Sequence, residues 1–189
     1  KKAGGQLTEC GESIAVDNEG NCYVTGYFSG TITFDYISLK SAGDRDIFIA
    51  KIDKDGNWLW AKKAGGTEWD QGGGIAVDRE GNCYVTGSFS DTATFGSTTL
   101  TSSGNSDIFI AKIDKDGNWL WANKVGGSEW DHGIGIAVDR EGNCYVIGSF
   151  MSTTTFGSTM LTCKGGCDIF IAKADTNGYW LWANSAGGR

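Results

Sequence analysis

The sequence predicts an all-β protein made of three tandem four-stranded antiparallel blades of the β-propeller type. Three observations predict this fold class. The sequence repeats at a fixed interval, its strand-like segments are bounded by turn residues, and these strands are apolar on both faces. The segment IAVD begins at Ile14, Ile75 and Ile136, so the repeat is 61 residues long. A period of this size indicates supersecondary units, each of which buries its surface against its neighbours.

The repeat interval also sets the domain organisation. We expect residues 1–5, KKAGG, to be the tail of a preceding repeat because residues 62–66 have the same sequence. The three repeats are then residues 6–66, 67–127 and 128–188, with no linker between them. The first repeat is the divergent one.

Each repeat contains four predicted strands: IAVD, NCYVTGSF, DIFIAKID and NWLWA in the second unit. They are rich in β-branched and aromatic residues, and the linking segments DREGN and DKDGN place glycine where a tight hairpin needs a positive φ. Because side chains alternate along a strand, Ile108 and Ile110 should face one way and Phe109 and Ala111 the other. Sheets that are apolar on both faces must be covered on both sides, as blades stacked around a propeller axis are.

A longer segment, SDTATFGSTTLTSSGNS, separates the second and third strands, and we expect it to add an outer strand or a hairpin. Cys22, Cys83 and Cys144 occupy the same position in the three units. Cysteines at equivalent positions of separate repeats rarely pair with one another, so we interpret these three as small buried apolar residues.

The stretch GIAVDREGNCYVTGSF, followed by DIFIAKIDKDGNWLWA, resembles the bacterial SBBP-type β-propeller repeat and, more distantly, the NHL repeat. The resemblance covers all three units and includes turns as well as strands. It implies a propeller fold and, since such repeats are mostly described as extracellular modules, an extracellular or cell-surface location. It implies no particular activity.

Composition argues against several classes of partner. The formal net charge is −7, with 30 glycines and no proline, which differs from the basic footprint of a nucleic-acid-binding protein. No apolar run approaches the roughly 20 residues that cross a bilayer, and KKAGGQLTEC lacks the apolar stretch of a signal peptide. We therefore expect no nucleic acid and no membrane insertion, with the chain either mature or separated from a signal that lies outside this sequence.

Three blades are too few for a closed ring, because closed propellers typically have about 4–8 blades. Three arrangements remain open. The chain could be part of a longer array, two chains could close a six-bladed ring, or units could stack into an open solenoid or filament. We expect self-association, as a homo-oligomer or filament.

The candidate binding residues lie in two copies of an EWD loop between repeats. They are Glu68, Trp69, Asp70, Glu129, Trp130 and Asp131. A tryptophan beside two carboxylates suits a sugar ring, which stacks on the indole and hydrogen-bonds to the acids. The competing interpretation, which we favour, is a bulky plug between blades, because the first unit has Leu7, Thr8 and Glu9 at these positions.

The remaining motifs suggest structure rather than chemistry. IDKDGNW resembles the start of a calcium loop but lacks the later acidic ligand, so we favour an Asx-stabilised turn and predict no metal and no cofactor. Cys163 and Cys167, in CKGGC, are predicted to form a local disulfide, which would place the protein outside the reducing cytosol.

No catalytic residue is predicted. The lone His132 corresponds to Gln71 in the second unit and has no nucleophile motif to serve. The sequence therefore favours a non-catalytic extracellular repeat scaffold or assembly module. The alternative is a carbohydrate- or protein-binding module that uses the EWD loops and the inserts.

Overall fold

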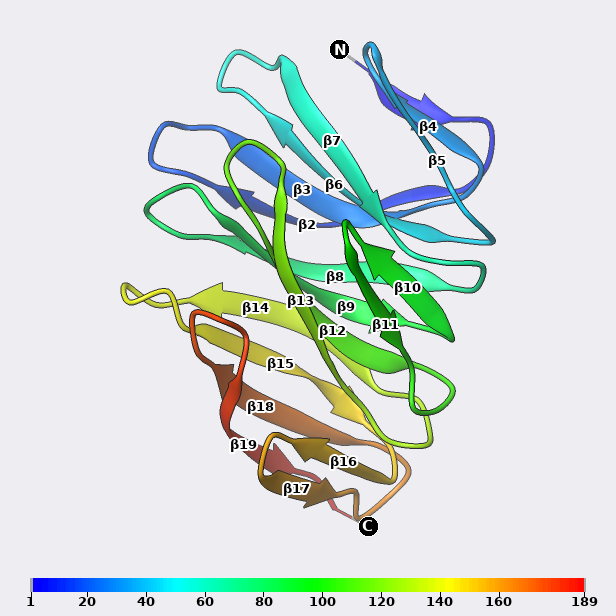
Figure 1. Ribbon diagram of the computed structural model, residues 1–189, viewed down its shortest axis with the longest axis vertical. Helices are drawn as coiled ribbons and strands as arrows, with labels where there is room; N and C mark the ends of the chain where they lie inside the picture. Colours follow the sequence, from blue (N-terminus) through cyan, green and yellow to red (C-terminus); the bar gives the residue numbers. More distant parts are fainter. Residues whose placement is uncertain (1, 189) are drawn as a thin grey trace.

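The computed structural model describes residues 2–188, and within this range the protein consists of β-strands joined by turns and loops, without a helix. The described residues accordingly contain no helix that could cross a membrane. Three four-stranded antiparallel sheets follow one another along the long axis of the molecule, from the N-terminal sheet to the C-terminal one (Figure 1). The predicted fold class is confirmed, and the three sheets do not close into a ring.

Each sheet is an up-and-down meander with its first strand innermost. The first sheet has the order β2-β3-β6-β7, with β2 Glu9–Val16, β3 Cys22–Phe28, β6 Asp46–Ile52 and β7 Trp58–Ala64. The second has the order β8-β9-β12-β13, with β8 Asp70–Val77, β9 Cys83–Phe89, β12 Asp107–Ile113 and β13 Trp119–Val125. The third has the order β14-β15-β18-β19, with β14 His132–Val138, β15 Cys144–Phe150, β18 Asp168–Ala174 and β19 Trp180–Ala186.

The insert of every repeat forms a hairpin outside its sheet, as the sequence predicts. The hairpins are β4 Thr31–Phe34 with β5 Ile37–Lys40, β10 Thr92–Phe95 with β11 Thr98–Thr101, and β16 Thr153–Phe156 with β17 Thr159–Thr162. The short N-terminal strand β1, Ala3–Gly5, pairs with β4 and makes that hairpin a three-stranded sheet.

Two apolar layers hold the stack together, and they use opposite faces of the middle sheet. Phe109 and Ala111 belong to the cluster between the first and second sheets, whereas Ile108 and Ile110 belong to the cluster between the second and third. All four side chains are buried. The predicted alternation along DIFIAK is thereby confirmed, and each interior sheet face is a packing surface.

The sheets spread apart from their inner strands. The innermost strand β8 of the middle sheet contacts both β2 and β14, the innermost strands of the other two sheets. Hairpin β10–β11 lies between the outer strands β7 and β13. Phe95 of this hairpin packs against Phe109 and Trp119, with ring centroids 4.9 and 5.5 Å apart. The hairpins therefore fill the wide outer end of each wedge, which is the geometry of neighbouring propeller blades.

The tight turns are Asx-stabilised. Asp53 Oδ1 accepts hydrogen bonds from the backbone N–H groups of Asp55 and Asn57, and Asp53 Oδ2 accepts one from Asn57 Nδ2. Gly56 has a φ of 81°, which favours glycine. DKDGN thus builds the predicted hairpin turn.

The cysteines divide into two groups. Cys83 and Cys144 are fully buried between sheets, as predicted, while Cys22 is half-buried because no sheet covers it. The disulfide predicted between Cys163 and Cys167 is not formed in the structure, where both thiols are free. The loop folds back so that Cys163 Sγ donates to the Gly165 carbonyl, and the Lys164 N–H donates to the buried Asp168 carboxylate.

Candidate functional site

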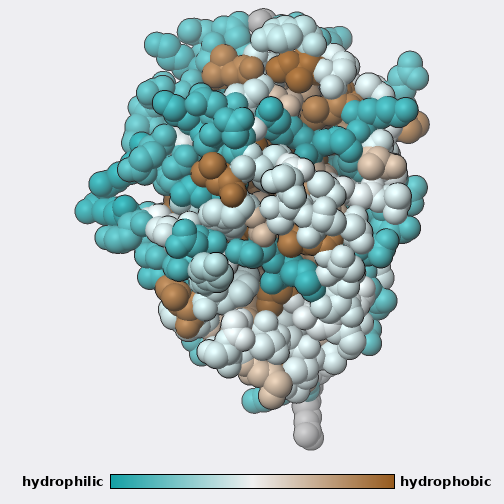
Figure 2. Space-filling model, viewed as in Figure 1, coloured by the Kyte–Doolittle hydropathy of each residue, from teal (hydrophilic) through white to brown (hydrophobic). Residues whose placement is uncertain are grey.

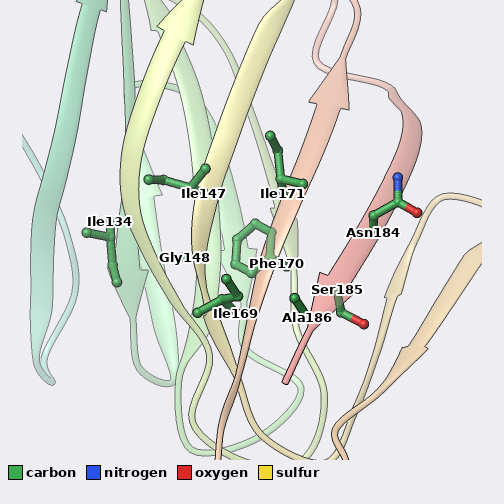
Figure 3. Close-up of a pocket in the computed structure, with 9 residues that line it drawn as sticks. All are labelled: Ile134, Ile147, Gly148, Ile169, Phe170, Ile171, Asn184, Ser185 and Ala186. Carbon is green, nitrogen blue, oxygen red and sulfur yellow. The ribbon is translucent and has the colours of Figure 1, made fainter. Parts of the chain in front are cut away.

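The third sheet has an uncovered apolar face, which we call the trailing face. It is formed by Ile134 of β14, Ile147 of β15, and Ile169 and Ile171 of β18, whose side chains project from the same side of the sheet (Figure 3). Together with Asn184, Ser185 and Ala186 of β19 they line a cavity of about 510 Å³. Contiguous exposed apolar surface of this kind often marks an interaction site.

The equivalent positions in the second sheet show that the trailing face is a packing surface. Ile169 and Ile171 are 63% and 43% exposed, whereas Ile108 and Ile110, one repeat earlier, are completely buried beneath the third sheet. Ile147 stands where the second repeat has the buried Thr86, so the third repeat is more apolar at this exposed position. The trailing face is therefore an inter-blade packing surface without a following blade.

The opposite end carries the complementary surface, which we call the leading face. Ile14 and Val16 of β2 are 62% and 58% exposed, while the equivalent Ile75 in the second sheet is buried against the first. Cys22 and Val24 of β3 lie on the same side and are only half-buried. The chain thus exposes both halves of an interface that it contains twice in its interior.

Polar contacts also tie each blade to the next. Tyr23 Oη donates to the Gly81 carbonyl at 3.1 Å, and Trp60 Nε1 donates to the Lys115 carbonyl at 3.0 Å. Trp121 Nε1 repeats the second contact with Thr176 at 3.1 Å. At the trailing face the equivalent residues are Tyr145 and Trp182, and residues 2–188 include no further turn for them to contact.

A second candidate site is a shallow groove where the two EWD loops come together. Glu68, Trp69, Ser90, Asn105 and Trp130 line it and enclose about 350 Å³. We call it the Trp groove. Its two indoles are 56% and 45% exposed, so they are not plugs between blades, and the interpretation that the sequence favours is wrong.

Local contacts hold both indoles in place. The Arg45 guanidinium lies 4.3 Å from the centre of the Trp69 ring, and Trp69 Nε1 donates to Asp44 at 3.2 Å. Trp130 stacks against His132 with ring centroids 6.2 Å apart, and burial lowers the pKa of His132. The groove is a preformed aromatic surface with carboxylates at its rim.

The structure removes Asp70 and Asp131 from the predicted ligand-binding set, because both side chains are fully buried. Asp70 accepts hydrogen bonds from the Gly66 and Ser90 N–H groups, and Asp131 accepts them from Gly127 and Met151. Each carboxylate fastens the end of one blade to the start of the next. Burial raises the pKa of Asp70 to about 7, with a further contribution from the charge of Asp46, and burial likewise raises the pKa of Asp131.

The flank of the molecule that faces the reader in Figures 1 and 2 has a different character. Hydrophilic and neutral residues cover most of it, and apolar residues occur there in small separate groups (Figure 2). Among the described residues, no group of three or more His, Cys, Asp or Glu side chains is placed to hold a metal ion. The two open sheet faces and the Trp groove are thus the surfaces with a recognisable chemical character.

The fold and these surfaces define a repeat protein of the β-propeller type. Residues 59–88, from β7 of the first sheet to β9 of the second, match the family model of the SBBP β-propeller repeat. The chain therefore carries the SBBP repeat, and the resemblance inferred from its motifs is confirmed.

Curated relatives agree with this assignment. An uncharacterized WD repeat-containing protein of Acanthamoeba polyphaga mimivirus is 31% identical over 156 residues, which is 73% of this chain and 11% of that protein. The regulatory protein FlaEY of Caulobacter vibrioides is 30% identical over 140 residues, which is 72% of this chain and 15% of that protein. The chain thus spans a small part of the length of both relatives.

Among solved structures, a protein of unknown function from Bacteroides caccae aligns with 93% of this chain and 81% of its own. The TM-score is 0.33 and the identity is 10%.

Proposed function

We propose that the chain is a non-catalytic, extracellular or cell-surface scaffold module that assembles head to tail through its leading and trailing faces. One observation carries the proposal: Ile169 and Ile171 are exposed at positions whose counterparts, Ile108 and Ile110, are buried under the next blade. Burial of apolar surface contributes roughly 25 cal/mol per Å², so covering both faces is a driving force for association.

The contact is heterologous, because the trailing face of one copy meets the leading face of another. Such contacts give a closed ring if the rotation between copies closes and an open filament if it does not. Two copies would supply six blades, which is within the usual range for a closed propeller.

Sedimentation velocity over a range of protein concentrations tests this proposal. We expect the wild-type chain to shift to larger species as its concentration rises, and Ile169→Lys to remain monomeric. The matched control is Met160→Lys, which changes a residue equally exposed but located on hairpin β16–β17. A wild-type chain that stays monomeric at high concentration would falsify the assembly function.

A second candidate function is glycan or protein binding in the Trp groove. It is favoured by the exposure of Trp69 and Trp130 and by the way their loops converge on one groove with Glu68 and Asn105. Tryptophan fluorescence titrated with a panel of mono- and oligosaccharides tests it. Binding should be lost in both Trp69→Ala and Trp130→Ala, and a flat titration with every sugar would remove the carbohydrate version of this candidate.

A further inference from the structure

The junction between the first and second blades contains a cation held by aromatic rings. The Arg45 guanidinium lies 4.7 Å from the centre of the Tyr27 ring and 4.3 Å from the centre of the Trp69 ring. Tyr27 belongs to β3, Arg45 directly precedes β6, and Trp69 directly precedes β8. At this junction the chain therefore supplies its own cation to the tryptophan of the EWD loop.

The junction between the second and third blades lacks this internal cation. Ser106 stands at the position of Arg45, while Trp130 keeps the position of Trp69. A parallel bridge joins each of these pairs, so the backbone is arranged alike at both junctions. The tyrosine is also replaced, by Ser88. Serine carries no charge and is too short to extend over an indole, so Trp130 receives no cation from these positions.

The Trp groove lies at this second junction. Asn105, which directly precedes Ser106, lines it together with Trp130 and with Glu68 and Trp69 of the preceding EWD loop. Both indoles are about half exposed. The groove thus offers aromatic surface where the preceding junction holds a guanidinium.

The charges around the Trp groove favour a cation as its ligand. Glu68 lines the groove, and none of the five lining residues is a lysine or an arginine. Glu129 lies beside it, because its Oε2 accepts a hydrogen bond from Asn105 Nδ2 at 3.4 Å. Burial lowers the pKa of His132, so the ring that stacks on Trp130 is neutral at pH 7. An anion would be repelled by the two carboxylates, whereas a cation is attracted both to them and to the indole faces.

Among cations, a guanidinium group matches this site best. It is planar, so it stacks on an aromatic face, and its N–H groups form a fork that fits a carboxylate. Trp69 already contacts this group, from Arg45, within the chain. An ammonium group is more strongly hydrated and lacks the planar shape.

We propose that the Trp groove binds the guanidinium group of an arginine side chain on a partner peptide or protein, stacked on Trp130 and paired with Glu68. The inference rests on the second candidate function, binding in the Trp groove, and names the chemical class of the ligand. It is independent of head-to-tail assembly, because both junctions lie inside the chain.

NMR titration of the indole N–H signals tests this assignment, with Nα-acetyl-arginine amide as the probe. The Nε1–H signals of Trp69 and Trp130 should shift and saturate, and Trp69→Phe and Trp130→Phe assign them. Nα-acetyl-citrulline amide has nearly the same shape without the charge, so it should bind at least about tenfold more weakly. Equal binding of both probes, or no saturable shift with the arginine probe, would overturn the proposal.

Two charge variants test the pairing with Glu68. Glu68→Gln should weaken binding of the arginine probe by about fivefold or more, because a charge-assisted hydrogen bond is lost. The matched control is Glu141→Gln, which removes the same charge from the exposed turn at the far end of β14 and should leave binding unchanged. Equal weakening in both variants would attribute binding to net charge and contradict the pairing.

Ser106→Arg supplies the missing cation from within the chain. Its guanidinium should occupy the groove as Arg45 occupies the first junction, and a tethered group competes at high effective concentration. Binding of the arginine probe should therefore fall by about tenfold or more. Circular dichroism checks that the variant is folded, and unchanged binding in a folded variant would contradict the assignment.

Arg45→Ser tests the same equivalence without adding a side chain. It uncovers the rings of Tyr27 and Trp69, so the number of arginine probes bound per chain should rise from one to two. A variant that still binds one probe would contradict the equivalence of the two junctions.

A panel of sugars separates this inference from the function on which it rests. Saturable shifts of the two indole signals with a sugar, but not with the arginine probe, would overturn the guanidinium ligand and leave binding in the groove in place. A groove that responds to neither class of probe would remove both.

Discussion

At the scale of single residues, the same side chain has different roles in different repeats. Ile108 fills the layer between two sheets, while Ile169, its equivalent, lies on an open face. Asp70 appears from the sequence to be a surface acid beside Trp69, yet it is buried and bonded to backbone N–H groups while the indole remains exposed. The place of a side chain in the folded stack, rather than its residue type, therefore decides whether a ligand can reach it.

Asp70 gives a prediction about pH. Its pKa is raised to about 7 in the folded protein, against an ordinary value near 4 in the unfolded chain. The folded state therefore holds the extra proton, so this group's contribution to stability is present below about pH 4 and is lost as the pH rises through about 7. We expect the free energy of unfolding to fall as the pH rises from 4.5 to 8. The fall should be about 1–3 kcal/mol larger in wild type than in Asp70→Asn.

Urea denaturation at a series of pH values measures this difference. Glu68→Gln, which alters an exposed neighbouring carboxylate, serves as the control and should keep the wild-type profile. Parallel profiles for wild type and Asp70→Asn would contradict the prediction.

At the scale of strands, each blade fixes its third strand to its fourth with a lysine, except the last blade. Lys63 Nζ lies 2.6 Å from Asp46, and Lys124 Nζ lies 2.5 Å from Asp107, with both carboxylates buried. Lys63 therefore neutralises a buried acid on the neighbouring strand. The third repeat has Ser185 at this position, so Asp168 lacks the equivalent lysine. Its Oδ1 is buried without a partner among the described residues, as is Oδ1 of Asp107.

Ser185→Lys should therefore stabilise the third blade. A lysine there can reach Asp168 as its equivalents reach Asp46 and Asp107, and a hydrogen bond to a charged group contributes about 1.5–3 kcal/mol. We expect the free energy of unfolding to rise by about 1 kcal/mol or more once the ordering of the lysine side chain is subtracted. Chemical denaturation at a concentration where the chain is monomeric measures it.

Asn184→Lys is the matched control, because it adds the same charge at the neighbouring exposed position. A similar gain in both variants would attribute the effect to net charge and contradict the ion pair. The reverse change, Lys124→Ser, should destabilise the chain because it leaves the Asp107 charge buried and uncompensated.

At the scale of the whole molecule, the stack is an arc of blades with an unmatched surface at each end. Neighbouring inner strands touch, and the outer hairpins fill the space between neighbouring sheets. The two ends are complementary because they are the two sides of one repeated interface. Cys22 lies on the leading face, at the position that Cys83 and Cys144 occupy in the interior.

Thiol reactivity follows this arrangement. Burial raises the pKa of both Cys83 and Cys144, to about 12 for the latter, which suppresses the reactive thiolate. We expect a maleimide to label these two cysteines only after unfolding, while the other four react in the native monomer. Mass spectrometry of the labelled peptides gives the outcome for each site.

Association should change the labelling of one site selectively. Cys22 should become protected as the protein concentration rises, and Ile169→Lys should prevent that protection, whereas the exposed Cys167 should react equally in all samples. Labelling of Cys22 that is independent of concentration in an associating sample would place the contact elsewhere.

The sequence by itself determined the repeat length, the four strands of each blade, the Asx turns, the outer hairpins and the two-sided apolar sheets. These are local consequences of period, alternation and turn chemistry, and they are read from segments such as DKDGN and DIFIAK. Only the tertiary structure decided that Asp70 is buried while Trp69 is exposed, that the thiols of Cys163 and Cys167 are free, and that β1 pairs with β4. The exposure of Ile169 against the burial of Ile108 depends on whether another sheet covers that face, and the identical segment DIFIAK carries no local signal of its place in the stack.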